Sequence, residues 1–307
     1  IERMAHYDLT APISADEPEL EWEECVRIAR DVLVPFSPRL AEVVNMAINA
    51  RWIDVGPREG KIGGGYCAGI NKEHGSRIML NFIPSFGIVQ TLAHELGHAH
   101  HNDCLKDRTP LQADTPMALA ETASMFCQRL VEDAVLESSP PARKLTALDQ
   151  ILMEATGLML DLHARFHFEA EVFERRKKSS IPVEELTAMM AEKQRIAFGD
   201  ALDPDLVHRW QWVQKPHYFD VDRHFYNYPY QFGMLFSLGL LKVYREQPDG
   251  FADRYERLLS RTGMATAAEL AADFGIDIRD TAFWNGSVSV IRADVDAFVE
   301  LASQGNT

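Results

Sequence analysis

Cysteine is scarce in this sequence of 307 residues. Its four cysteines, Cys25, Cys67, Cys104 and Cys127, show no CxxC spacing. So small and scattered a set argues against a disulfide framework and favours a reducing compartment, so we expect a cytoplasmic protein. Long apolar runs are also missing. The run from Met234 to Leu241 is much shorter than the roughly 20 residues that a membrane-spanning helix requires.

Positive charge is in the minority, with 31 basic against 46 acidic residues and a formal net charge of −15. This balance favours solubility and repels phosphate backbones and anionic lipids, so we expect neither nucleic acid nor a membrane as a partner. The opening residues, Ile1 to Asp8, lack a basic start followed by an apolar stretch, so no export signal is visible. A chain that opens on Ile1 is also compatible with a fragment.

Apolar residues at helical spacing make up most of the chain. Two helices are expected within 21–49, followed by a glycine-rich segment at 56–66 and two short strands, 66–70 and 77–82, around a polar turn at 71–76. Further helical segments are expected near 87–103, 110–137, 141–178, 182–200, 228–247, 249–262 and 281–303. The sequence predicts a mainly α fold with a small antiparallel sheet, in a single domain over 1–307, because no long linker interrupts it.

The motif with the clearest chemistry is HExxH, formed by His94, Glu95 and His98 within a helical run. Histidines four residues apart lie about 40° apart around a helix, so both imidazoles can bind one Zn²⁺. Glu95 then stands beside the metal, where a carboxylate can take the proton of an attacking water. The alternative is a chance match, in which the histidines are ordinary core or surface residues.

A catalytic zinc usually has three protein ligands, so a third must exist. The extension HExxHxxGxxH is excluded because His101 and Cys104 stand where it requires Gly and His. Glu121 is the candidate, because it lies in an otherwise apolar helical stretch, where an unpartnered carboxylate is costly to bury. A structural salt bridge of Glu121 remains the alternative.

Beyond this motif, the chain resembles the oligoendopeptidase F and thimet oligopeptidase family of zinc metallopeptidases. The segments that carry the resemblance are Gly60-Lys61, Gly64 to Tyr66, Leu80 to Phe82, Thr91 to His101, Ala120 to Ser124, Lys215 to Phe219, Phe225 to Gly233, Gly275 to Asp277 and Phe283-Trp284. The resemblance implies the C-terminal, catalytic half of a longer two-lobed peptidase of the gluzincin type, with one zinc ion per chain. It also implies short unfolded oligopeptides as substrates, held along a strand beside the cleft.

Carried over by position, the resemblance implies His94, His98 and Glu121 as zinc ligands and Glu95 as the general base. It also implies that two later segments donate hydrogen bonds to the oxyanion at the scissile carbonyl. In order of preference, these donors are His217 before His224, and Tyr230 before Tyr226 and Tyr228. The alternative for the tyrosines is simple packing at a helix start.

Two positions depart from the family pattern. Met234 stands where a tyrosine often follows the glycine, and Gln128 stands where a glutamate often supports a ligand histidine. These departures keep open a second hypothesis, a catalytically weakened, zinc-stabilised domain that binds peptides. A hydrolase of a non-peptide amide has no support in the sequence. A second histidine pair, His163 and His167, is interpreted as solvated or packed because no third ligand accompanies it.

Overall fold

The computed structural model describes residues 3–13, 19–71 and 75–304. The chain divides into two compact units, each described here by itself. Unit 1 comprises Ile1–Ile13 and Asp149–Gln231, and unit 2 comprises Ser14–Leu148 and Phe232–Thr307. Two of the three boundaries fall inside helices, α6 (Pro141–Thr156) and α9 (Tyr228–Glu246). The single domain over 1–307 stays a prediction.

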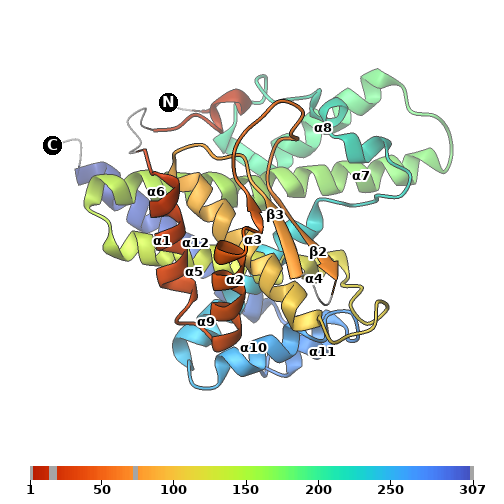
Figure 1. Cartoon of the computed structure of the whole chain (residues 1–307). Helices are drawn as coiled ribbons and strands as arrows, with labels where there is room; N and C mark the ends of the chain where they lie inside the picture. The colour runs from red at the N-terminus through yellow and green to blue at the C-terminus, as the bar shows by residue number, and fades with distance from the viewer. Residues whose placement is uncertain (1–2, 14–18, 72–74, 305–307) are drawn as a thin grey trace. The chain divides into compact units, whose positions relative to one another are not determined.

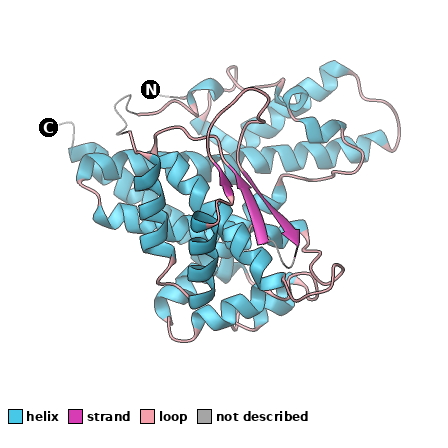
Figure 2. Cartoon of the chain, in the orientation of Figure 1, coloured by secondary structure: helices cyan, strands magenta, loops and turns pink. Residues whose placement is uncertain are grey.

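Both units are built mainly of helices, and the strands form one small sheet in unit 2 (Figure 2). Apart from its shares of α6 and α9, unit 2 contains α1 (Trp22–Leu33), α2 (Pro38–Asn49), α3 (Phe86–Leu105), α4 (Met117–Ala120), α5 (Thr122–Ser138), α10 (Phe251–Leu259), α11 (Ala267–Ala272) and α12 (Thr281–Gln304). Unit 1 contains α7 (Leu162–Arg176), α8 (Val183–Phe198), a π-helical turn at Gly157–Asp161 and short 3-10 turns at His6–Asp8, Gly199–Ala201, Gln211–Gln214 and Pro216–Phe219. The expected mainly helical fold is confirmed.

The sheet differs in detail from its prediction. Strands β2 (Tyr66–Asn71) and β3 (Gly75–Met79) pair antiparallel, as expected, and β1 (Ile53–Asp54) adds to β3 in parallel. A strand of two residues is too short to leave a pattern in the sequence. The order β1-β3-β2 places β2 at an edge of the sheet. The predicted turn at 71–76 includes residues 72–74, which lie outside the described part of the chain.

Helix α3 is the central element of unit 2. Most of its residues are buried, including polar ones such as Gln90 and His100, as expected for a helix packed on several sides. It packs against α1, α2 and α5, and against β2 and β3 (Figure 1). The N-terminus of its neighbour α2 is capped by Ser37, which accepts a hydrogen bond from the backbone N–H of Leu40. Pro38 follows at the first helical position.

The helical prediction fails at two places. Residues 110–116, expected to be helical, form turns that lead into the short helix α4, and α11 was not anticipated.

In unit 2 an aromatic cluster forms part of the hydrophobic core. Phe126 stacks on Phe251 with the ring centroids 5.8 Å apart, and Tyr255 lies 4.5 Å from Phe126. Unit 1 has its own smaller core around Phe168, Met189 and Met190.

Candidate metal centre

The two histidines of the motif project from α3 on one face. Their ring centroids lie 4.9 Å apart, and their side chains are 17% and 20% exposed. Both rings are therefore accessible from outside α3, where they can bind a metal ion. Glu121 lies next to them, with its Oε2 atom 3.2 Å from Nε2 of His94 and 3.3 Å from Nε2 of His98.

Glycines allow this approach. A Cβ atom at Gly97 would lie 2.4 Å from the backbone oxygen of Ala123, so only glycine lets α3 and α5 come so close. A Cβ atom at Gly233 would lie 2.5 Å from Cβ of Glu121, so α9 also leaves room for this residue. Both close contacts surround the break between α4 and α5, which is where Glu121 stands.

The break itself is held by hydrogen bonds inside unit 2. Ser237 and Tyr255 both donate a hydroxyl hydrogen bond to the backbone oxygen of Thr122, at 2.9 and 3.1 Å. Ser124 donates its own hydroxyl to Oε2 of Glu121 at 2.8 Å. The Ser124 hydroxyl therefore helps to orient the Glu121 carboxylate, whose Oε2 atom faces the two histidines.

This arrangement fits a metal ion. The ligand atoms of His94, His98 and Glu121 all lie within 4.8 Å of one another, the only such group among the described residues. Zinc bonds of about 2.05 Å at the tetrahedral angle separate ligand atoms by about 3.3 Å. The two distances to Glu121 match that separation. Two imidazoles and one carboxylate also leave a fourth position open, as in catalytic zinc sites.

The charges of the group are mutually dependent. Burial alone would raise the pKa of the Glu121 carboxyl, but hydrogen bonds with His94 and His98 outweigh burial and hold that pKa well below its usual range. Burial alone would likewise lower the pKa of His94, but Glu121 outweighs it and raises that pKa. A divalent cation could satisfy the same carboxylate and both ring nitrogens.

Glu95 stands beside the group, 4% exposed. Its Oε2 atom is buried without a hydrogen-bond partner among the described residues, so this oxygen is available to accept a hydrogen bond or a proton. Burial raises the pKa of Glu95. The chain before β2 passes close to it, because a Cβ atom at Gly65 would lie 3.2 Å from Oε1 of Glu95.

The other ring nitrogen of His94, Nδ1, also makes a hydrogen bond. Nδ1 of His94 lies 3.0 Å from Oε1 of Gln128, and Gln128 in turn donates its amide to Oε1 of Glu132 at 2.9 Å. Gln90 donates to the same carboxylate oxygen at 2.7 Å. Because the amide nitrogen of Gln128 faces Glu132, its oxygen must accept from Nδ1–H, which leaves Nε2 of His94 free to bind a metal. The sequence did not single out Glu132 or Gln90.

The predicted oxyanion donors belong to unit 1. His217 is half-buried, and its Nε2 lies 3.1 Å from Nδ2 of Asn227. The Tyr230 hydroxyl donates to the Tyr226 hydroxyl at 3.2 Å, and the rings of His217 and Tyr226 lie 5.8 Å apart. The structure therefore brings His217, Tyr226 and Tyr230 into one cluster. Their catalytic role stays a prediction.

A strained turn precedes these tyrosines. Phe225 adopts a left-handed backbone conformation, with φ of 51°, which is unfavourable for a bulky residue. Its backbone N–H donates to Oε1 of the buried Glu169 at 2.8 Å, which holds the turn. His224, the second-choice donor, is exposed, with its ring 5.5 Å from that of Phe173. Tyr228 is 38% exposed.

The remaining singled-out residues lie elsewhere. Met234 is buried in the unit 2 part of α9. His163 and His167 are exposed on α7 with their ring centroids 4.4 Å apart, and no third ligand joins them among the described residues.

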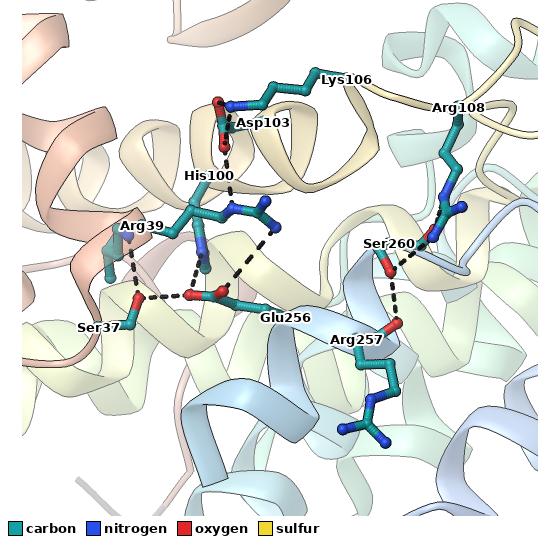
Figure 3. Close-up of polar contacts among 10 residues, drawn as sticks. Ser37, Arg39, His100, Asp103, Lys106, Arg108, Glu256, Arg257 and Ser260 are labelled. Carbon is teal, nitrogen blue, oxygen red and sulfur yellow. Dashed lines mark hydrogen bonds and ion pairs between the residues drawn. The ribbon is translucent and has the colours of Figure 1, made fainter. Parts of the chain in front are cut away.

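Behind the metal-facing side of α3, a polar network joins three helices. His100 is fully buried, with Nε2 3.5 Å from Oε1 of Glu256 on α10. The Ser37 hydroxyl at the start of α2 donates to the same carboxylate oxygen at 2.6 Å. Arg39 lies between Glu256 and Asp103, at 4.0 and 3.3 Å (Figure 3). Nothing in the sequence pattern predicted this network.

The chain is similar in sequence to curated oligopeptidases. The chain is 23% identical over 302 residues to an oligoendopeptidase F homologue of Lactococcus lactis subsp. lactis, covering 97% of this chain and 50% of that protein. It is 22% identical over 301 residues to oligopeptidase PepF of Bacillus subtilis, covering 96% and 44%. The chain thus spans about half the length of these relatives.

A solved structure of PZ peptidase A with inhibitor 2 shares the fold, with a TM-score of 0.76 and 19% identity, covering 99% of this chain and 53% of that chain. A search of the described helices found none long and apolar enough to cross a membrane. The model of peptidase family M3 matches residues 32–289, which is most of the sequence. This chain therefore belongs to peptidase family M3.

Proposed function

We propose that this chain is the catalytic part of a zinc-dependent endopeptidase that hydrolyses peptide bonds in short oligopeptides. One observation carries the proposal. Oε2 of Glu121 lies at the separation that tetrahedral zinc needs from Nε2 of both His94 and His98, beside a buried carboxylate with an unpartnered oxygen. Membership of peptidase family M3 supports the reaction class.

The three ligands would be His94, His98 and Glu121. A zinc ion held there would supply Lewis-acid polarisation of the scissile carbonyl and would lower the pKa of a nearby water to near neutrality. Glu95 accepts a proton from the attacking water and returns it to the nitrogen of the leaving amine. Its burial favours this role, because a raised pKa brings a carboxyl closer to the working pH of a proton carrier.

The negative charge that develops on the carbonyl oxygen needs further hydrogen-bond donors. We assign this role first to His217 and then to Tyr230 and Tyr226, on the resemblance to the family and on their clustering inside unit 1. His224 is less well supported, because it is exposed and contacts Phe173.

The substrate would lie extended along β2. This strand is at the edge of the sheet, and the chain enters it at Gly65, beside Glu95. An edge strand can bind a peptide through its backbone groups, which holds unfolded peptides with little regard for side chains. Short oligopeptides are therefore the proposed substrates, and the cytoplasmic location stays a prediction.

Substitution of Glu95 by Gln tests the mechanism. In the E95Q variant we expect zinc to remain bound, because no ligand changes, while hydrolysis of a mixed library of short peptides falls by about 10²–10⁴-fold. Metal content and peptide products would be measured by mass spectrometry on the same sample. The control is E137Q, the same change at an exposed position of α5. Undiminished cleavage by E95Q would refute the assignment.

The same measurement of products distinguishes the peptidase from the second hypothesis, a catalytically weakened, zinc-stabilised domain that binds peptides. Gln128 retains a hydrogen bond to His94, so the departure at this position does not by itself leave the ligand unsupported. If the unaltered chain with full zinc occupancy binds library peptides and yields no products, the peptide-binding domain replaces the peptidase as the better account.

A further inference from the structure

The inference starts from the orientation of one amide, that of Asn227. This side chain is 3% exposed and lies between His217 and Arg165, all within unit 1. Asn227 was not predicted as a functional residue from the sequence. The oxygen of its buried amide can only accept hydrogen bonds, and the nitrogen can only donate them. The orientation of the amide therefore determines whether each neighbour must donate or accept.

Arg165 fixes that direction. Its Nη1 atom lies 2.9 Å from Oδ1 of Asn227, and a guanidinium can only donate, so the amide oxygen faces the arginine. The amide nitrogen, which can only donate, therefore faces Nε2 of His217 at 3.1 Å. His217 must accept this hydrogen bond at Nε2. A neutral imidazole that accepts at Nε2 carries its hydrogen on Nδ1.

Arg165 is itself held in place. Its Nη2 atom pairs with Oδ2 of Asp161 at 2.9 Å, where both side chains are less than a fifth exposed. The other oxygen of Asp161 accepts from the amide of Gln211 at 2.7 Å, and Tyr218 donates to the backbone oxygen of Arg165 at 3.3 Å. The guanidinium therefore cannot turn away from Asn227 without also breaking its ion pair with Asp161.

The surroundings also favour an uncharged ring. Burial lowers the pKa of His217, and the cations Arg165, Lys215 and Arg223 lower it further. An unprotonated His217 near neutral pH agrees with the acceptor role that Asn227 imposes on Nε2.

We propose that Asn227, aimed by Arg165, is a positioning residue that keeps His217 in the neutral form with its hydrogen on Nδ1. The inference rests on the proposed function for its use, because the oxyanion of peptide hydrolysis needs an N–H donor. In the other neutral form the hydrogen would be on Nε2, opposite the amide of Asn227, and Nδ1 would offer only a lone pair. Asn227 thus decides which nitrogen of His217 can donate.

The hydrogen position can be measured directly by NMR of the chain with ¹⁵N-labelled histidine, where H217Q identifies the signals of His217. We expect Nδ1 of the unaltered chain to carry the hydrogen. N227D keeps the shape of the side chain and its pairing with Arg165, but a carboxylate accepts, so the hydrogen should move to Nε2. The control is N285D, the same change at an exposed position of α12.

A hydrogen on Nε2 in the unaltered chain would overturn the proposal, and so would an unchanged His217 in folded N227D. For catalysis, we expect N227D to lower kcat by about 10²-fold, the size of one lost oxyanion donor, with little change in KM. If the hydrogen moves as expected but kcat of N227D and H217Q stays at the level of the unaltered chain, the positioning stands and the catalytic assignment of His217 fails.

Discussion

Gln128 is the residue through which α5 supports the candidate zinc ligand His94. In Q128L the hydrogen bond to Nδ1 is lost while the apolar volume is kept, so zinc affinity should fall by about 10- to 100-fold, the usual effect of removing such a partner. Competition with a chromophoric chelator would measure this change. Q247L, which alters an exposed glutamine in the loop after α9, is the control and should leave the affinity unchanged.

Substitution of Gln128 by glutamate, a charged side chain of similar shape, gives a second comparison of zinc affinity. Gln128 donates its amide to Glu132 at 2.9 Å, and a second carboxylate at this position would face that buried acid. We therefore expect Q128E to bind zinc no more tightly than the unaltered chain. A clear gain in affinity would contradict the hydrogen-bond direction assigned to Gln128.

Among the elements, the contact between α3 and α5 determines whether the site exists. A methyl group at Gly97 would lie 2.4 Å from a backbone oxygen of α5, and backbone cannot rotate out of the way as a side chain can. G97A should therefore separate the helices, lower the free energy of unfolding by about 1–3 kcal/mol and weaken zinc binding. Urea unfolding with and without added zinc would measure both effects.

Gly87 lies on the same helix and gives a matched control. Its added methyl group would meet only the Ser85 hydroxyl, at an ordinary 3.6 Å. G87A should be neutral or stabilising by up to about 1 kcal/mol, because alanine favours helix more than glycine does. Equal effects of G97A and G87A would show that helix propensity, not the close approach of α5, explains the result.

For the molecule as a whole, the Glu256 network predicts how stability depends on pH. Burial alone would raise the pKa of Glu256, but the ion pair with the His100 ring and the hydrogen bond from the Ser37 hydroxyl outweigh burial and lower it. A carboxyl with a lowered folded pKa stabilises above its unfolded pKa of about 4.3, and this stabilisation is lost as pH falls through the folded pKa. Acid should therefore weaken the joint between α2, α3 and α10.

Substitution by Gln tests this dependence. E256Q leaves the buried His100 without a charged partner, so we expect a loss of about 3 kcal/mol in the free energy of unfolding at neutral pH. The difference from the unaltered chain should shrink as pH falls below the unfolded carboxyl pKa of about 4.3 and towards the lower pKa of folded Glu256. Denaturant titrations across pH would measure it, with E137Q as the control. A difference that stays constant down to pH 3 would contradict the assignment.

The sequence by itself determined the helical fold class, the HExxH geometry and the candidacy of Glu121. These features depend on local spacing: a helix fixes the relation of residues four apart, and an acid in an apolar stretch needs a partner wherever it packs. The family pattern added the prediction that His217 and the tyrosines donate to the oxyanion, and this stays a prediction. That pattern could not show that Asn227, inside the second of the two donor segments, orients the side chain of His217 in the first.

The tertiary structure alone decided how distant residues meet. Gly97 and Gly233 bring three helices together around Glu121, and the hydroxyls of Ser237 and Tyr255 hold the break that carries it. The direction of the Asn227 amide depends on Arg165, 62 residues earlier in the chain. Hydrogen-bond direction and close backbone approach are properties of packed surfaces, and no spacing along a single segment records them.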